Sequence, residues 1–202
     1  MILKQFLILE HQMKHITLLT TATLVATTLI LPLSVQAEGW QVLPVMKQGY
    51  KPDFAVAVVA GTMEADDDNT DKYAPVGVEL SMNCPLLKAP NHDIRQQISY
   101  LQSDKNGVKS MAFELSPHHM YKVANKLTIG FGPALGYTKV EKDTGSDGVF
   151  TYGAGVSTRY NIAKGAFVGA EARYVKAQEL EIDGVKSGFD NGRAVIKLGY
   201  QF

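Results

Sequence analysis

The residues best suited to catalysis in this sequence lie in one run, Ser116-Pro117-His118-His119. A serine becomes a nucleophile when a histidine within hydrogen-bond reach takes its proton and a carboxylate orients that histidine. In an extended strand, Ser116 and His118 would share one face and His119 would lie on the other. If the sheet closes into a barrel, this alternation places the Ser–His pair in the barrel interior, whereas a lipid-cleaving site needs a lipid-facing groove. We therefore assign no catalytic residue.

A second cluster offers the hard oxygen ligands that calcium prefers, namely Asp66-Asp67-Asp68 with Glu64 and Asp71. Its spacing lacks the central glycine and the closing glutamate of the helix-flanked calcium loop. We interpret it as a solvated acidic loop, and we expect no metal and no cofactor. The single Cys84 cannot form an internal disulfide, so we expect a buried or turn thiol there.

The elements that would position these residues are β-strands in which apolar and polar positions alternate. At the C-terminus, one face carries Ala194, Ile196, Leu198, Tyr200 and Phe202, while the other includes Arg193 and Lys197. Eight such segments can be drawn, at about 53–63, 73–83, 94–103, 110–123, 127–140, 149–162, 166–178 and 191–202. Each has the length of about ten residues that a tilted strand needs to cross the hydrocarbon layer of a membrane.

The connections between these segments alternate in length. The polar connections 64–72, 104–109, 141–148 and 179–190 follow the odd strands, whereas tight turns at 124–126 and 163–165 follow even ones. The connection 84–93 is longer than this pattern requires. The pattern is typical of an eight-stranded antiparallel up-and-down transmembrane barrel, which is the all-β fold we predict for 53–202. The alternative is a soluble lipocalin-like barrel with apolar residues inside.

The N-terminus predicts a cleaved secretory signal. Met13-Lys14-His15 is a short basic start, 16–33 is uncharged and rich in Leu, Thr and Ala, and Val35-Gln36-Ala37 has the small-x-small form of a cleavage site. We therefore place an upstream extension and the signal in 1–37, with the true start at Met13, and a periplasmic lead in 38–52. An uncleaved membrane anchor is the alternative.

The charged face of the predicted strands would line the barrel interior. The residues expected there as a lumen charge network are Glu79, Arg95, Glu114, His118, Arg159, Glu171, Arg173, Arg193 and Lys197. Isolated charges in a confined site are costly, so they should form ion pairs and hydrogen bonds with one another. An eight-stranded barrel has an interior only wide enough for side chains. Glycines on this face and the paired charges favour the membrane barrel over the soluble one.

With its signal, its eight strands, the segment Gly169-Ala170-Glu171-Ala172-Arg173-Tyr174 and the ending Gly199-Tyr200-Gln201-Phe202, the chain resembles the small OmpA/OmpX-like outer-membrane β-barrel superfamily. No peptidoglycan-binding domain is expected. The resemblance implies an integral protein of the Gram-negative outer membrane and cell envelope. It also implies that barrel-assembly machinery reads Tyr200 and Phe202 as an assembly signal.

These features predict a non-enzymatic outer-membrane protein of structural or surface-interaction type with a polar lumen filled by side chains. Its expected partners are outer-membrane lipid, the barrel-assembly machinery and an extracellular ligand bound through the outer loops. A narrow ion or small-solute channel is the alternative, and a lipid-modifying enzyme is less favoured. The balance of 20 basic and 20 acidic residues argues against nucleic acid as a partner.

Overall fold

The computed structural model describes residues 39–65, 72–178, 180–182, 185–187 and 190–202. The chain divides into two units, Met1–Glu38 and Gly39–Phe202. The predicted extension and signal in 1–37 lie outside the described residues, as does the acidic run Asp66-Asp67-Asp68. The second unit contains all of the architecture that follows.

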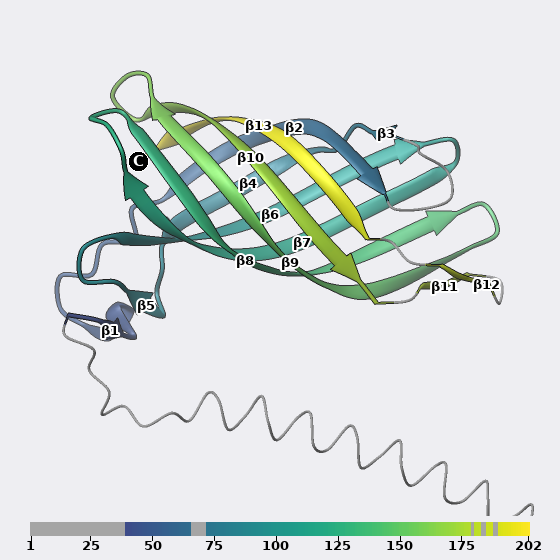
Figure 1. Cartoon of the computed structure of the whole chain (residues 1–202), viewed down its shortest axis with the longest axis horizontal. Helices are drawn as coiled ribbons and strands as arrows, with labels where there is room; N and C mark the ends of the chain where they lie inside the picture. The colour runs from purple at the N-terminus through teal and green to yellow at the C-terminus, as the bar shows by residue number, and fades with distance from the viewer. Residues whose placement is uncertain (1–38, 66–71, 179, 183–184, 188–189) are drawn as a thin grey trace, which may run out of the picture. The chain divides into compact units, whose positions relative to one another are not determined.

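The second unit is a closed antiparallel barrel, which confirms the predicted fold (Figure 1). Its eight long strands are β2 (Ala55–Ala65), β4 (Val76–Asn83), β6 (Asp93–Lys105), β7 (Val108–Lys122), β8 (Leu127–Lys142), β9 (Gly145–Asn161), β10 (Ala166–Ala177) and β13 (Asn191–Gln201). Each pairs with its neighbour in this order, and β13 returns to pair with β2. Closure leaves no unpaired strand edge among these eight strands, because the last strand pairs through its backbone with the first.

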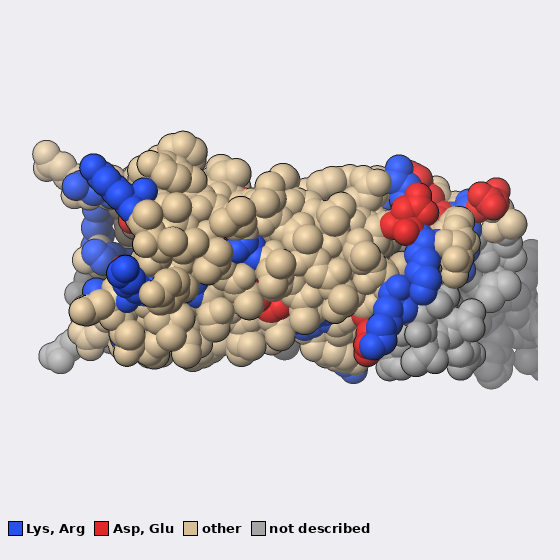
Figure 2. Space-filling model, turned by 90° about the horizontal axis from the view of Figure 1, so that it is seen from above, with Lys and Arg blue, Asp and Glu red and all other residues tan. Residues whose placement is uncertain are grey.

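Side chains alternate between a buried interior and an exposed exterior along every long strand. The exterior is apolar, with exposed Val58, Val78, Leu135, Val156 and Ile196 around the wall. Aromatic side chains are exposed near both ends of the strands, including Tyr160, Tyr200 and Phe202 at one end and Phe113, Tyr137 and Phe150 toward the other. Figure 2 shows charged side chains gathered at the two ends, with a broad band almost free of them between.

The two ends of the barrel differ in their connections. The turn end carries 123–126, 162–165 and both the start of β2 and the end of β13. The opposite, loop end was predicted to carry long connections at 104–109 and 141–148, and this prediction was wrong. Lys105 pairs with Val108 and Lys142 with Gly145, so two residues suffice for each turn.

The difference has a physical cause at the first of these turns. Asn106 and Gly107 both have positive φ, at 53° and 76°. An Asn-Gly pair with this backbone makes a tight hairpin turn whose twist matches that of the strands. The strands β6 and β7 therefore continue into polar sequence. These polar residues extend beyond the apolar exterior band of the barrel. The connection between β10 and β13 contains a short antiparallel pair, β11 (Leu180–Ile182) with β12 (Val185–Ser187).

The lead folds against the long connection between β4 and β6. It contains β1 (Gln41–Val42) and the 3-10 turn η1 (Pro44–Met46), and β1 pairs with β5 (Leu87–Lys88) in that connection. A short β3 (Lys72–Tyr73) adds to the loop end of β2. No helix among the described residues is long and apolar enough to span a membrane.

Two prolines within strands, Pro117 of β7 and Pro133 of β8, face each other across one ladder. Leu115 lies opposite Leu135 and His119 opposite Phe131, which sets Pro117 opposite Pro133. Neither proline has a backbone N–H, so the β7–β8 ladder is interrupted at this point while its register is kept. Pro75 precedes β4 and lies outside the strand predicted to contain it.

Candidate functional site

The candidate site is the interior of the barrel, where six charged side chains form one continuous chain. We call Arg193, Glu114, Arg173, Glu171, Lys197 and Glu79, in this order of contact, the ion chain. Their side chains are at most 6% exposed. These residues come from β4, β7, β10 and β13, so the barrel must close before the ion chain can form.

Every link of the ion chain is a direct contact between opposite charges. Glu114 accepts from Arg173 Nη1 at 2.8 Å and from Arg193 Nη1 at 2.9 Å, and it contacts Arg193 Nη2 as well. Glu171 accepts from Arg173 Nη2 and from Lys197 Nζ, each at 2.7 Å. Lys197 also donates to Glu79. Three anions and three cations therefore alternate, and the buried group has no net charge.

Glycines on the interior face make room for these long side chains. A Cβ at Gly136 would lie 2.8 Å from Glu114 Cγ, and one at Gly155 would lie 3.2 Å from Arg173 Nε. Both distances are too short for comfortable packing, so the ion chain occupies space that glycine leaves. The glycines on the interior face of the strands therefore provide the space in which the charged side chains pair.

The other predicted lumen residues lie apart from the ion chain. Arg95 is buried near the turn end, where it donates to Ser81 Oγ at 3.0 Å and to the Asp53 carbonyl at 2.8 Å. Arg159 is half-buried, donates to Gln201 and lies 3.8 Å from the centroid of the Phe167 ring. Such a cation over an aromatic face is favourable when it is partly desolvated. The two arginines therefore form a basic layer near the turn end.

The histidine of the catalytic candidate contacts a different serine from the one suggested by sequence. His118 Nδ1 lies 2.7 Å from Ser157 Oγ, whereas Ser116 Oγ has no hydrogen-bond partner among the described residues. All three side chains are buried inside the barrel. A nucleophile there could not meet a substrate in the membrane. No cluster of three metal-binding side chains occurs in the part of the chain that the structure describes.

Apolar side chains fill other parts of the barrel interior. Met63, Val140 and Val149 form a buried cluster near the loop end, supported by Tyr73 and Val108. Val59, Leu101 and Val195 form a second buried cluster within the barrel. These layers are what an interior filled by side chains requires, and they narrow any path for solutes.

Sequence reasoning missed a rim formed at the turn end by the lead and the connection 84–93. Trp40 from the lead packs edge-on against His119, whose ring also contacts His92 and Tyr121. Tyr50 donates to the Asn83 carbonyl at 2.6 Å. Burial, with a smaller contribution from the Cys84 thiol, raises the pKa of Tyr50. The signal that could have revealed this rim is the lone tryptophan beside an unusually long connection.

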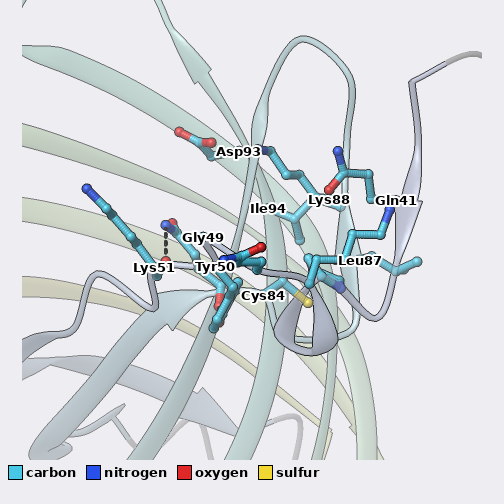
Figure 3. A pocket seen from close by; sticks show the side chains of 13 residues that line it. Gln41, Gly49, Tyr50, Lys51, Cys84, Leu87, Lys88, Asp93 and Ile94 are labelled. Carbon is cyan, nitrogen blue, oxygen red and sulfur yellow. Dashed lines mark hydrogen bonds between the residues drawn. The ribbon is translucent and has the colours of Figure 1, made fainter.

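A pocket of about 450 Å³ lies within this rim (Figure 3). Lys51 stands on one side of it and Lys88 on the other, with Tyr50 and the buried Cys84 between them. Asn83 Nδ2 donates to the Lys51 carbonyl at 3.0 Å and holds the lead to the end of β4. The rim is therefore an organised part of the molecule.

The predicted assembly signal lies on the exterior at the turn end. Tyr200 is 49% exposed and Phe202 is 77% exposed, and their ring centroids are 5.5 Å apart. The Phe202 backbone N–H donates to the Phe54 carbonyl at 2.9 Å, which joins the last residue to the start of the first long strand. The Phe202 ring is thus available to another molecule while its backbone helps to close the barrel.

Comparisons with known proteins agree with this architecture. A family model described as the outer membrane protein beta-barrel domain matches residues 23–202. Neisserial surface protein A has a TM-score of 0.57 and 14% identity, over 74% of this chain and 97% of that chain. Ail, the attachment invasion locus protein of Yersinia pestis, has a TM-score of 0.48 and 14% identity over the same shares. OprG from Pseudomonas aeruginosa has 0.44 and 12%, over 75% and 96%.

A comparison with curated proteins gives no match. At an identity of 14%, the likeness to Neisserial surface protein A establishes a shared fold and nothing about a shared activity. The family model covers the whole of the described barrel.

Proposed function

This chain belongs to the outer membrane protein β-barrel domain family, and from that premise we propose that it is a non-enzymatic structural or surface-interaction protein. It is a barrel of the bacterial outer membrane, and its apolar exterior band faces lipid. The ion chain is the observation that supports the proposal. It fills the interior with paired charges, which stiffens the wall and leaves the two ends of the barrel to make contacts.

Conductance decides between this role and a narrow channel. We expect purified protein in planar bilayers to give no conductance steps above background, because the ion chain and the apolar clusters occupy the interior. A variant with a deliberately opened interior, Glu114→Ala/Arg193→Ala, is the positive comparison for the same preparation. Reproducible steps from the unaltered protein would overturn the structural role in favour of the channel.

The absence of enzymatic function is tested with the buried Ser–His residues. Ser116→Ala, His118→Ala and Ser157→Ala should leave the lipid A and phospholipid profiles of the membrane unchanged, since no substrate in the membrane reaches these side chains. A profile that changes with the histidine and with one serine, while barrel abundance stays constant, would make the protein a lipid-modifying enzyme.

Two partners remain part of the proposal. Assembly machinery would bind the exposed Tyr200 and Phe202 side chains of β13. An extracellular ligand would bind the loop end, where the β6–β7 and β8–β9 hairpins extend the wall (Figure 1). The predicted contact loops at 64–72 and 179–190 lie largely outside the described residues.

A further inference from the structure

Two hollows meet at the turn end of the barrel, and we propose that together they bind one anionic phospholipid. The first would receive its phosphate and the second an acyl chain. This site is separate from the interior and does not depend on whether the protein also binds a ligand at its loop end.

The first hollow is the rim pocket of about 450 Å³, and its lining is cationic. Lys47, Lys51 and Lys88 line it, against one carboxylate, Asp93. All three lysine side chains are exposed, so each is free to turn toward a phosphate. A lysine ammonium binds phosphate as a point charge without a fixed geometry. The pocket therefore has the charge and the adaptability that a phosphodiester head group requires.

The second hollow is an apolar groove of about 930 Å³ on the outer wall, across β7 to β10 and β13. Small outward residues are part of its lining, among them Pro133, Ala154 and Ala172. The larger Phe131 and Val156 also line it. The interrupted β7–β8 ladder lies beneath this groove, since Pro117 and Pro133 both belong to its lining. A groove in a wall that faces lipid fits a hydrocarbon chain.

The two hollows adjoin, and this contact identifies the class of ligand. Leu87 and Ile94 line both of them, and Trp40 and His119 line the groove close to the same place. A free anion would use only the cationic pocket, and a neutral lipid would gain only from the groove. A molecule with an anionic head joined to an apolar chain uses both. Aromatic side chains at the junction suit the depth at which a lipid's head group meets its chains.

The test is lipid binding by the full-length barrel, folded in detergent and followed by native mass spectrometry with dioleoyl phosphatidylglycerol or dioleoyl phosphatidylcholine. The pocket variant is Lys47→Gln/Lys51→Gln/Lys88→Gln. Its matched control is Lys122→Gln/Lys126→Gln/Lys164→Gln, which removes three lysines from the same end outside the pocket. We expect the pocket variant to bind phosphatidylglycerol between about tenfold and 100-fold more weakly, since three lysines act on an anionic lipid. The control should change by less than about twofold.

The groove is tested with Ala154→Trp, which fills it without altering charge. Its control is Ala170→Trp, at an outward position on β10 that does not line the groove. We expect only Ala154→Trp to weaken phosphatidylglycerol binding, with a gel mobility shift on boiling showing that both variants fold. Equal losses in the two lysine variants, equal binding of the two lipids, or full binding by Ala154→Trp would each overturn the proposal.

Discussion

Glu114 contacts two buried guanidinium groups, those of Arg173 and Arg193, and it is therefore the residue on which the ion chain depends most. Arg173 also contacts Glu171, but Arg193 contacts only Glu114 among the described ion pairs. Removing one partner of a buried pair leaves an uncompensated charge, which costs more than the pair contributes when intact. A single residue, Glu114, is thus expected to have a large effect on the stability of the barrel interior.

We predict that Glu114→Gln lowers the free energy of unfolding by about 3 to 5 kcal/mol, because it leaves two buried arginines short of a negative partner. Urea unfolding in detergent micelles, followed by intrinsic fluorescence, measures the change. The matched control is Glu64→Gln, which breaks an exposed pair with Lys72 at 2.9 Å and should produce no measurable change. Equal effects of the two substitutions would mean that the interior pairs contribute no more than surface pairs do.

Alternation along a single strand is a local property, which is why the facing of these residues was accessible from sequence. The structure buries eight of the nine predicted lumen positions and half-buries Arg159. The partners were not accessible, because Arg193 and Glu114 are 79 residues apart and meet only through the register of a closed barrel. Ser116 and His118 share the interior face as predicted, but the partner of His118 was not accessible, since Ser157 belongs to β9.

At the scale of elements, β7 and β8 approach each other closely where their two prolines face. A Cβ at Gly132 would lie 2.0 Å from the Pro117 carbonyl oxygen, which belongs to the backbone and cannot rotate away. Glycine is therefore required by the approach of two strands at this position. By contrast, a Cβ at Gly192 on β13 would meet nothing within 4 Å.

We predict that Gly132→Ala lowers the free energy of unfolding by about 1 to 3 kcal/mol, as overpacking of a tight contact does. Gly192→Ala should be neutral or stabilising by up to about 1 kcal/mol, because it restricts only the unfolded chain. Chemical unfolding of both variants under the same conditions provides the comparison. A neutral Gly132→Ala would show that the strands can separate at the prolines without cost.

Element boundaries were less predictable than element faces. Segments of the loop end were expected to be loops because they are polar, yet β6 through β9 continue through them. The strand count and order depended on apolar alternation, which membrane-facing strands must keep, whereas strand length depended on turn chemistry at Asn106-Gly107. The rim was missed because β1 and β5 are two residues each and carry no periodic pattern.

At the scale of the whole molecule, a substitution of Phe202 distinguishes the rate of assembly in the cell from the stability of the folded barrel. The Phe202 backbone closes the barrel through Phe54, but its ring is 77% exposed and contacts little except Tyr200. We predict that Phe202→Ala slows insertion in cells several-fold while leaving unfolding in detergent within about 0.5 kcal/mol of the unaltered protein. Pulse-labelling with the gel mobility shift on boiling measures the first quantity.

Phe150→Ala is the control for that experiment, since Phe150 is 68% exposed on the same wall but lies far from the C-terminus. Slow insertion of both variants would indicate a general need for exterior aromatics. Normal insertion of Phe202→Ala would remove the terminal aromatic from the assembly signal and leave Tyr200 as its remaining candidate.

The order of charges along the ion chain also makes its charge balance depend on the last strand. Glu79 and Glu114 belong to β4 and β7, whereas Arg193 and Lys197 arrive with the last strand. Without β13, the ion chain would hold three carboxylates against Arg173 alone, while Arg95 and Arg159 stay apart from it near the turn end. Pairing of β13 adds Arg193 and Lys197 and balances the charges of the ion chain. A barrel truncated before β13 would therefore leave this buried group with two negative charges in excess.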